Sequence, residues 1–461
     1  MEGIRGRRFA VAGLGVSGLA ACRALIEHGG WVVAFDQKPA DSGPMIHVVD
    51  GLQALGINVV SQWNGHLDPE DFDVLVVSPG LPKTHPSQRA MASREIWGEV
   101  ELAYRISRAP ILAITGTNGK STTTVLLYLL LQAAGRKTRL CGNIAGSGWP
   151  EMPLTLAALE AEPSEVLAAE ISSFQLETVT EFRPRTATIT KIVPDHQDRH
   201  PSFEDYRDAK LNIFNRIGSG DSIIWNRSEP SVTEAMIRSR CGSGTELIDF
   251  DPFGEGRHTR REGDTLWLSG HPLHRSELLI PGEHNIANIF CAWEMACTIA
   301  DPGRDGVEAL KSFKGLANRM ENLGEKDGIL VINNSMCTNP DAVIASSQAI
   351  DRPQHLLIGG LTKSLDFRQV GEYLKESGHK PYIFGPNPDT MNEQLGGIGI
   401  IVETMPEAFQ QAVASARPGD AVLLAPGCAS AAPYTSFRER GEEFKKVAKE
   451  WLNNEGQDVG N

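Results

Sequence analysis

The feature that most constrains the fold is a glycine turn between an apolar strand, expected over residues 110–114, and an apolar helix, expected over residues 121–134. The turn reads Thr115-Gly116-Thr117-Asn118-Gly119-Lys120-Ser121-Thr122. Its glycines let backbone N–H groups face an anion, and the helix N-terminus adds partial positive charge. Lys120 would then reach the β- and γ-phosphates of a nucleotide, and the Ser121 hydroxyl would bind Mg²⁺. The run is shorter than GxxxxGK[ST], because Ile114 stands where the first glycine would be.

Strands alternate with helices along the whole chain, which favours an α/β fold with parallel sheets. A chain of 461 residues is too long for one ordinary core. The pattern divides it into three domains, expected over residues 1–108, 109–314 and 315–461. Within the second domain, short strand-like pieces over residues 245–280 predict a small antiparallel elaboration.

Composition excludes several classes of protein. The net charge of −14 argues against non-specific nucleic-acid binding, which needs clustered Lys and Arg. The seven cysteines are scattered without a CxxC pair, so we expect no zinc ribbon, no disulfide framework and a reducing compartment. Residues 1–8 are polar and basic, unlike a signal peptide, and no run approaches the ~18 apolar residues of a membrane span. The expected location is the cytoplasm, with neither nucleic acid nor membrane as a partner.

A second glycine turn lies near the start of the chain. Gly13-Leu14-Gly15-Val16-Ser17-Gly18 matches GxGxxG after an expected strand, and Asp36 ends the next one. This fingerprint alone predicts NAD or FAD binding, so a dehydrogenase is an alternative interpretation.

Four further motifs follow the phosphate loop in order. They are EISSFQLE at 170–177, DHQDR at 195–199, AKL at 209–211 and GEHN at 282–285. Together with the loop they resemble the Mur ligase and folylpolyglutamate synthase superfamily, and most closely the D-glutamate-adding branch of the Mur ligase family. The resemblance implies a three-domain α/β architecture: a Rossmann-like N-terminal domain, a central P-loop ATPase-type domain and a C-terminal Rossmann-like domain. Folylpolyglutamate synthases lack such an N-terminal domain.

The resemblance also implies a catalytic set made of Lys120, Glu170, His196 and Lys210. The expected metal ligands are Ser121, Glu170, His196 and Lys210, which would hold two Mg²⁺ ions. Lys210 is expected to be carbamylated, because a desolvated amine has a lowered pKa and can add CO₂; the pattern alone favours a solvated helix lysine. The residues expected to contact ATP are Gly116, Thr117, Asn118, Gly119, Lys120, Ser121, Thr122, Asn285, Asn288 and Arg319.

Substrate contacts are implied in the outer domains. In the D-glutamate-adding enzymes the N-terminal domain holds UDP, which points to Val16, Ser17, Asp36, Ser78, Pro79 and Gly80, with Asn143 beyond them. The incoming D-glutamate would meet Thr338, Lys363, Ser430 and Phe437. The implied reaction is ATP-dependent ligation of D-glutamate to UDP-N-acetylmuramoyl-L-alanine through an acyl phosphate, in a monomer serving peptidoglycan precursor synthesis.

Three positions depart from the family pattern. Asn318, Asn334 and Met336 stand where a histidine, an aspartate and a lysine are usual. A methionine carries no charge, so nucleotide contacts and amino-acid choice are open at this point. Two alternatives therefore remain beside the dehydrogenase: a Mur-like ligase with another acceptor or amino acid, and a silent homologue that only binds nucleotide.

Overall fold

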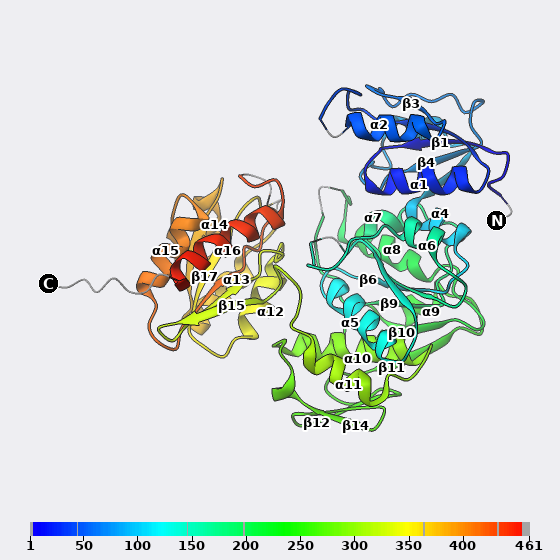
Figure 1. Ribbon diagram of the computed structural model, residues 1–461. Helices are drawn as coiled ribbons and strands as arrows, with labels where there is room; N and C mark the ends of the chain where they lie inside the picture. The colour runs from blue at the N-terminus through cyan, green and yellow to red at the C-terminus, as the bar shows by residue number, and fades with distance from the viewer. Residues whose placement is uncertain are drawn as a thin grey trace.

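The computed structural model describes residues 3–43, 45–144, 146–196, 199–362, 365–430 and 433–453. Within these residues the chain forms three successive α/β units, each with a sheet of its own (Figure 1). The blue N-terminal unit and the yellow-to-red C-terminal unit lie against different sides of the central unit (Figure 1). The predicted α/β class with parallel sheets is confirmed.

The N-terminal sheet is fully parallel, with strand order β3-β2-β1-β4-β5. Its strands are β1 (Arg8–Ala12), β2 (Trp31–Phe35), β3 (Asn58–Val60), β4 (Val74–Val77) and β5 (Glu95–Gly98). Its helices are α1 (Val16–Glu27), α2 (Met45–Ala54), α3 (Pro86–Ala90) and α4 (Glu99–Ile106). Helix α4 packs against α6 (Leu154–Glu160) of the central unit, so it joins the two units.

The central sheet has the order β11-β10-β9-β6-β8-β7, and all its pairs are parallel. Its strands are β6 (Ile111–Thr115), β7 (Thr138–Gly142), β8 (Val166–Glu170), β9 (Thr186–Ile189), β10 (Ser222–Asn226) and β11 (Glu246–Phe250). Its helices are α5 (Lys120–Ala133), α6 (Leu154–Glu160), α7 (Ser173–Leu176), α8 (Phe203–Leu211), α9 (Glu234–Arg238), α10 (Glu283–Cys297) and α11 (Gly303–Ser312). Helix α5 is buried along most of its length between the sheet, α10 and α11, which fixes the loop before it.

The C-terminal sheet has the order β15-β16-β20-β17-β18-β19. Only β15 among these strands runs antiparallel to its neighbour. The strands are β15 (Glu321–Lys326), β16 (Ile329–Asn333), β17 (Gln354–Gly359), β18 (Lys380–Phe384), β19 (Ile400–Ile401) and β20 (Ala421–Leu424). The helices are α12 (Pro340–Gln348), α13 (Arg368–Ser377), α14 (Pro388–Gln394), α15 (Met405–Ser415) and α16 (Phe437–Asn453).

The structure corrects one expectation about residues 245–280. Only β12 (Thr259–Glu262), β13 (Thr265–Leu268) and β14 (His271–His274) form an antiparallel sheet. Strand β11 instead extends the main sheet in parallel, because its apolar residues Ile248 and Phe250 join the core formed with α10. The two expected boundaries between the three domains fall in connections between elements, and they stay a prediction.

Candidate active site

A cavity of about 530 Å³ lies where the central and C-terminal units meet. Its wall includes the phosphate loop, the turns that follow β8 and β9, the start of α10, and residues 334–346 beyond β16. Ligands of open parallel sheets bind outside the carboxyl ends of the strands, and this cavity has that position.

The phosphate loop is held in a shape that requires glycine. Gly116 has φ +147° and Gly119 has φ +88°. A Cβ atom at Gly119 would lie 2.6 Å from the side-chain oxygen of Asn288. The N–H of Thr117 donates to the carbonyl of Lys191 at 2.6 Å, which ties the loop to the turn after β9. The loop is therefore a rigid cradle open to the cavity.

The loop lysine begins helix α5 and lines the cavity. Its Nζ donates to the carbonyl of Thr117 at 2.9 Å. Burial lowers the pKa of Lys120, while the charge of Glu170 acts in the opposite direction and that of Arg319 adds to the lowering. A lysine, a carboxylate and an arginine thus converge here, as expected of a site for phosphate and metal.

Glu170 is the last residue of β8 and is 1% exposed. Its Oε1 accepts from Asn143 Nδ2 at 3.3 Å, whereas Oε2 has no hydrogen-bond partner among the described residues. A buried carboxylate oxygen left without a partner is costly unless a cation satisfies it. Glu170 therefore fits the predicted role of Mg²⁺ ligand.

Lys210 is 2% exposed, so the interpretation as a solvated helix lysine is wrong. Its Nζ donates to the carbonyl of Gly116 at 2.8 Å and lies 4.5 Å from the centre of the Tyr206 ring. Burial, followed by the positive charge of Lys120, lowers the pKa of Lys210 well below its usual range. A larger uncharged fraction of the amine is what the addition of CO₂ requires.

His196 lies in the same cavity, on a backbone with φ +53°. Its ring is 4.9 Å from that of Phe174 and its backbone N–H donates to Asp195 Oδ1 at 2.8 Å. Within the described chain no group of three or more His, Cys, Asp or Glu side chains could hold a metal ion. The residues suit Mg²⁺ that takes its remaining ligands from hydroxyls, phosphate oxygens and water, and not a preformed cage.

The expected nucleotide contacts are brought together around the loop. Asn288 accepts from Thr123 at 3.2 Å, which fixes α10 against α5, and it donates to Asn285 within α10 at 3.1 Å. Arg319 donates to Ser121 Oγ at 3.3 Å. The loop residues Thr117, Asn118, Gly119, Lys120 and Thr122 line the cavity with them.

The expected UDP contacts lie elsewhere, at the N-terminal glycine turn. Asp36 accepts from the N–H of Leu14 at 2.7 Å, and Val16 is 71% exposed. Ser17 donates to Glu99 at 2.6 Å. Ser78, which opens the Ser78-Pro79-Gly80 turn, lies so close to this turn that a Cβ at Gly13 would meet its Cβ at 2.9 Å. Only Asn143 of the predicted substrate residues before the C-terminal unit lines the main cavity.

The predicted D-glutamate residues divide in two. Thr338 and Phe437 line the cavity. Ser430 lies outside the cavity wall formed by the described residues, and Lys363 lies outside the residues that the structure describes. Phe437 opens α16, and the ring lies against the Gly146 turn of the central unit.

The three departures from the family pattern have local partners. Asn334 donates to Ser346 at 2.6 Å, and Asn318 accepts from Asn333 at 3.0 Å. The sulfur of Met336 lies 3.1 Å from Arg319 Nη2 in the cavity wall. The two asparagines thus form hydrogen bonds within the C-terminal unit, and the methionine at position 336 brings no charge to the cavity.

Tyr206, Lys191 and Asp341 are among the cavity residues that sequence reasoning missed. Tyr206 hydrogen-bonds Thr117 at 3.0 Å from α8. Lys191 and Asp341 form an ion pair of 2.9 Å across the two units. The position of Lys191 just after β9 was an available signal, since side chains there face the ligand edge.

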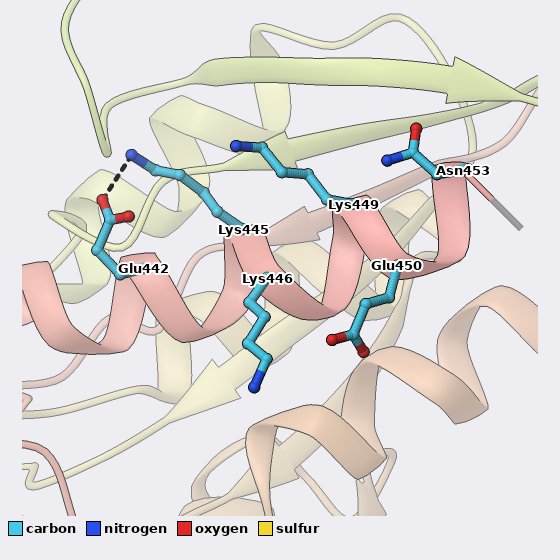
Figure 2. A pocket seen from close by; sticks show the side chains of 6 residues that line it. All are labelled: Glu442, Lys445, Lys446, Lys449, Glu450 and Asn453. Atoms are coloured by element: carbon cyan, nitrogen blue, oxygen red, sulfur yellow. Dashed lines mark hydrogen bonds and ion pairs between the residues drawn. The ribbon is translucent and has the colours of Figure 1, made fainter.

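A second hollow lies on the outer face of α16, lined by Glu442, Lys445, Lys446, Lys449, Glu450 and Asn453 (Figure 2). Lys445 already pairs with Glu442 at 2.8 Å and with Glu321 at 3.3 Å. These are charges of a solvated helix face, and none of the predicted site residues lies among them.

The chain matches the models of the Mur ligase middle domain over residues 114–296 and of the Mur ligase glutamate ligase domain over residues 318–428. It is 34% identical to UDP-N-acetylmuramoylalanine--D-glutamate ligase of Thermoanaerobacter pseudethanolicus, over 97% of this chain and 99% of that protein. It is 36% identical to the enzyme of the same name from Caldanaerobacter subterraneus, over 96% and 98% of the two chains. The chain belongs to the Mur ligase family.

Solved structures agree on the fold. MurF from Acinetobacter baumannii has a TM-score of 0.59 and 15% identity, over 98% of this chain and 91% of that one. The FolC protein of E. coli, in complex with DHPP and ADP, has a TM-score of 0.56 and 18% identity, over 76% and 92%. The predicted three-part Mur ligase architecture is confirmed.

Membership of the Mur ligase family makes the protein an ATP-dependent amide ligase. The dehydrogenase interpretation of the N-terminal glycine turn is therefore set aside. Among the described helices, none combines the length and apolar character that a bilayer span requires.

Proposed function

We propose that the protein joins D-glutamate to UDP-N-acetylmuramoyl-L-alanine, with ATP giving ADP and phosphate. The observation that carries the proposal is the convergence of Lys120, Glu170 and Lys210 on one cavity beside the phosphate loop. The relatives that bear the name of this activity match nearly the whole chain, which supports the choice of substrates.

The chemistry requires a carboxylate and a triphosphate to approach each other. Phosphorylation turns a carboxylate oxygen into a leaving group, and the D-glutamate amine then attacks the acyl carbon and expels phosphate. Lys120 and Arg319 offset the negative charge gathered in the cavity. Mg²⁺, when bound at Ser121, Glu170, His196 and Lys210, would supply further neutralisation; we propose two ions.

Lys210 is proposed to act as a carbamate. Its uncharged nitrogen would attack the carbon of CO₂, one C–O electron pair would move to oxygen, and the ammonium proton would leave to solvent. The product is an anionic oxygen group in place of an amine. The depressed pKa of Lys210, and the cavity that it shares with the unpartnered carboxylate oxygen of Glu170, support this proposal.

The substrate residues are proposed in two groups. Val16, Ser17, Asp36, Ser78, Pro79 and Gly80 would hold the UDP end, with Asn143 nearer the reacting carboxylate. Thr338, Lys363, Ser430 and Phe437 would receive D-glutamate. We further propose that the enzyme acts as a monomer in the cytoplasm; all seven cysteines are free thiols, which fits a reducing compartment.

A phosphate-release assay with UDP-N-acetylmuramoyl-L-alanine and a panel of amino acids tests the proposal. We expect release with D-glutamate and only background with L-glutamate, D-aspartate or glycine. Lys120→Ala should abolish release while the circular dichroism spectrum stays unchanged. Equal release with several amino acids, or with Lys120→Ala, would overturn the assignment.

A further inference from the structure

Lys191 occupies an unusual position between the phosphate loop and the C-terminal unit. Its backbone carbonyl accepts from Thr117 at 2.6 Å, and its backbone also bridges to Asn118. Its side chain points the other way along the cavity wall, to the first turn of α12, where Nζ contacts the two oxygens of Asp341 at 2.9 and 3.1 Å. One residue therefore supports the loop with its backbone and the opposite wall with its side chain.

Asp341 is shared between this lysine and the phosphate loop itself. Its Oδ2 also accepts from Asn118 Nδ2 at 3.2 Å. Both charged residues line the cavity, and His284 lies near enough to feel the charges of Lys191, Asp341 and Arg319. The pair is thus part of the wall that would face a triphosphate.

The pair is too exposed to be a strong structural link. The side chains of Lys191 and Asp341 are 38% and 35% exposed, and ion pairs of that exposure contribute little to stability. A phosphate group carries more charge than a carboxylate and offers three acceptor oxygens. An ammonium group in this position can exchange a carboxylate partner for a phosphate at a small cost in free energy.

We propose that Lys191 is a phosphate-binding residue that Asp341 holds in place until nucleotide arrives. When ATP enters the cavity, the ammonium group leaves Asp341 and binds a phosphate oxygen. This inference rests on the proposed function only in requiring that ATP occupies this cavity.

Equilibrium binding of a non-hydrolysable ATP analogue with Mg²⁺ to the full chain tests the exchange. Lys191→Met should weaken binding about tenfold, because a charge-assisted hydrogen bond is lost. Asp341→Asn should tighten binding about threefold, because the competing carboxylate is gone. Lys191→Arg should stay near the wild type. The opposite signs of the first two variants are the decisive result.

A matched control is available in Lys311, which pairs with Glu277 at 2.8 Å and has 30% side-chain exposure. Lys311→Met removes a similar ion pair and should leave the affinity unchanged. Steady-state kinetics provide a second measurement: in Lys191→Met the KM for ATP should rise while that for the UDP substrate stays constant.

Two results would overturn the proposal. If Lys191→Met and Asp341→Asn weaken binding of the analogue equally, the pair only links the two units. If neither changes the affinity, the pair is only a solvated ion pair. Failure of the proposed function is distinguishable: the phosphate-release assay tests the choice of amino acid, whereas a cavity that does not hold ATP would show as a wild type that does not bind the analogue or a Lys120→Ala variant that binds it equally well. Circular dichroism of each variant excludes misfolding.

Discussion

Lys210 is a buried amine that donates to a backbone carbonyl of the phosphate loop. If its function is that of a carbamate, Lys210→Ala removes a negative ligand and not a positive charge. We expect its rate of phosphate release to fall by about 100-fold or more. Acetate or propionate should restore part of the rate, because a small carboxylate can occupy the space that the truncated side chain leaves.

Lys120→Ala is the control for this rescue. It removes a neighbouring, partly buried cation, and no carboxylate can replace a cation, so acetate should not restore its rate. Rescue of both variants would mean a general effect of the acid, and rescue of neither would leave the carbamate without support.

At this scale the sequence could identify residues whose chemistry is contained in a motif. The phosphate loop predicts Lys120 and Ser121, and family resemblance adds Glu170 and Lys210. The position of Lys191 after β9 could have marked it as a site residue, but the sequence could not pair it with Asp341, because the partners are 150 residues apart. It also did not anticipate that Ser17 donates to Glu99, since the bond crosses between elements whose packing the sequence does not reveal.

Helix α5 offers two glycines that differ in what surrounds them. Gly119 precedes the helix with φ +88°, and a Cβ there would lie 2.6 Å from Asn288. Gly135 follows the helix with φ +72°, and a Cβ there meets no described atom within 4 Å. Both positions disfavour an L-residue, but only the first is crowded.

We therefore expect Gly119→Ala to weaken binding of the ATP analogue at least about tenfold, because the loop must move to admit the methyl group. Gly135→Ala should cost about 1 kcal/mol of unfolding free energy from backbone strain and leave nucleotide binding unchanged. Urea denaturation and binding titrations measure the two effects. Equal loss of binding in both variants would contradict the role given to the loop shape.

Elements were predictable where their pattern was strong. Helix α5 was predicted to within one residue at each end, since it begins and ends one residue before the expected bounds. The prediction was close because a glycine turn precedes the helix and a glycine follows it. Strands β3, β5, β7 and β15 were missed. Strand β15 reads ENLGEK, is an antiparallel edge strand and carries charges, as edge strands do to avoid pairing with other chains. Such a sequence has the composition of a loop, and only its partner β16 makes it a strand.

The whole molecule depends on how the N-terminal unit is fixed to the central one, through α4. Glu101 on this helix is fully buried, and its carboxylate accepts from the backbone N–H groups of Thr180, Glu181 and Phe182 at 2.8–3.1 Å. It also pairs with Arg105 at 2.7 Å. One carboxylate thus satisfies three backbone donors of the neighbouring unit, so its loss should lower the stability of both units.

Glu101→Ala leaves those donors without an acceptor, and we expect it to lower the free energy of unfolding by about 3 kcal/mol. Because the lost bonds join two units, calorimetry should resolve an earlier transition of the N-terminal unit. Glu101→Gln keeps an acceptor oxygen and should lose less. Glu27→Ala, which breaks an exposed pair with Arg23, should cost under about 0.5 kcal/mol. A Glu101→Ala protein that melts in a single transition close to the wild-type temperature would mean that the units are held together by their apolar contacts, α4 against α6, and not by this carboxylate.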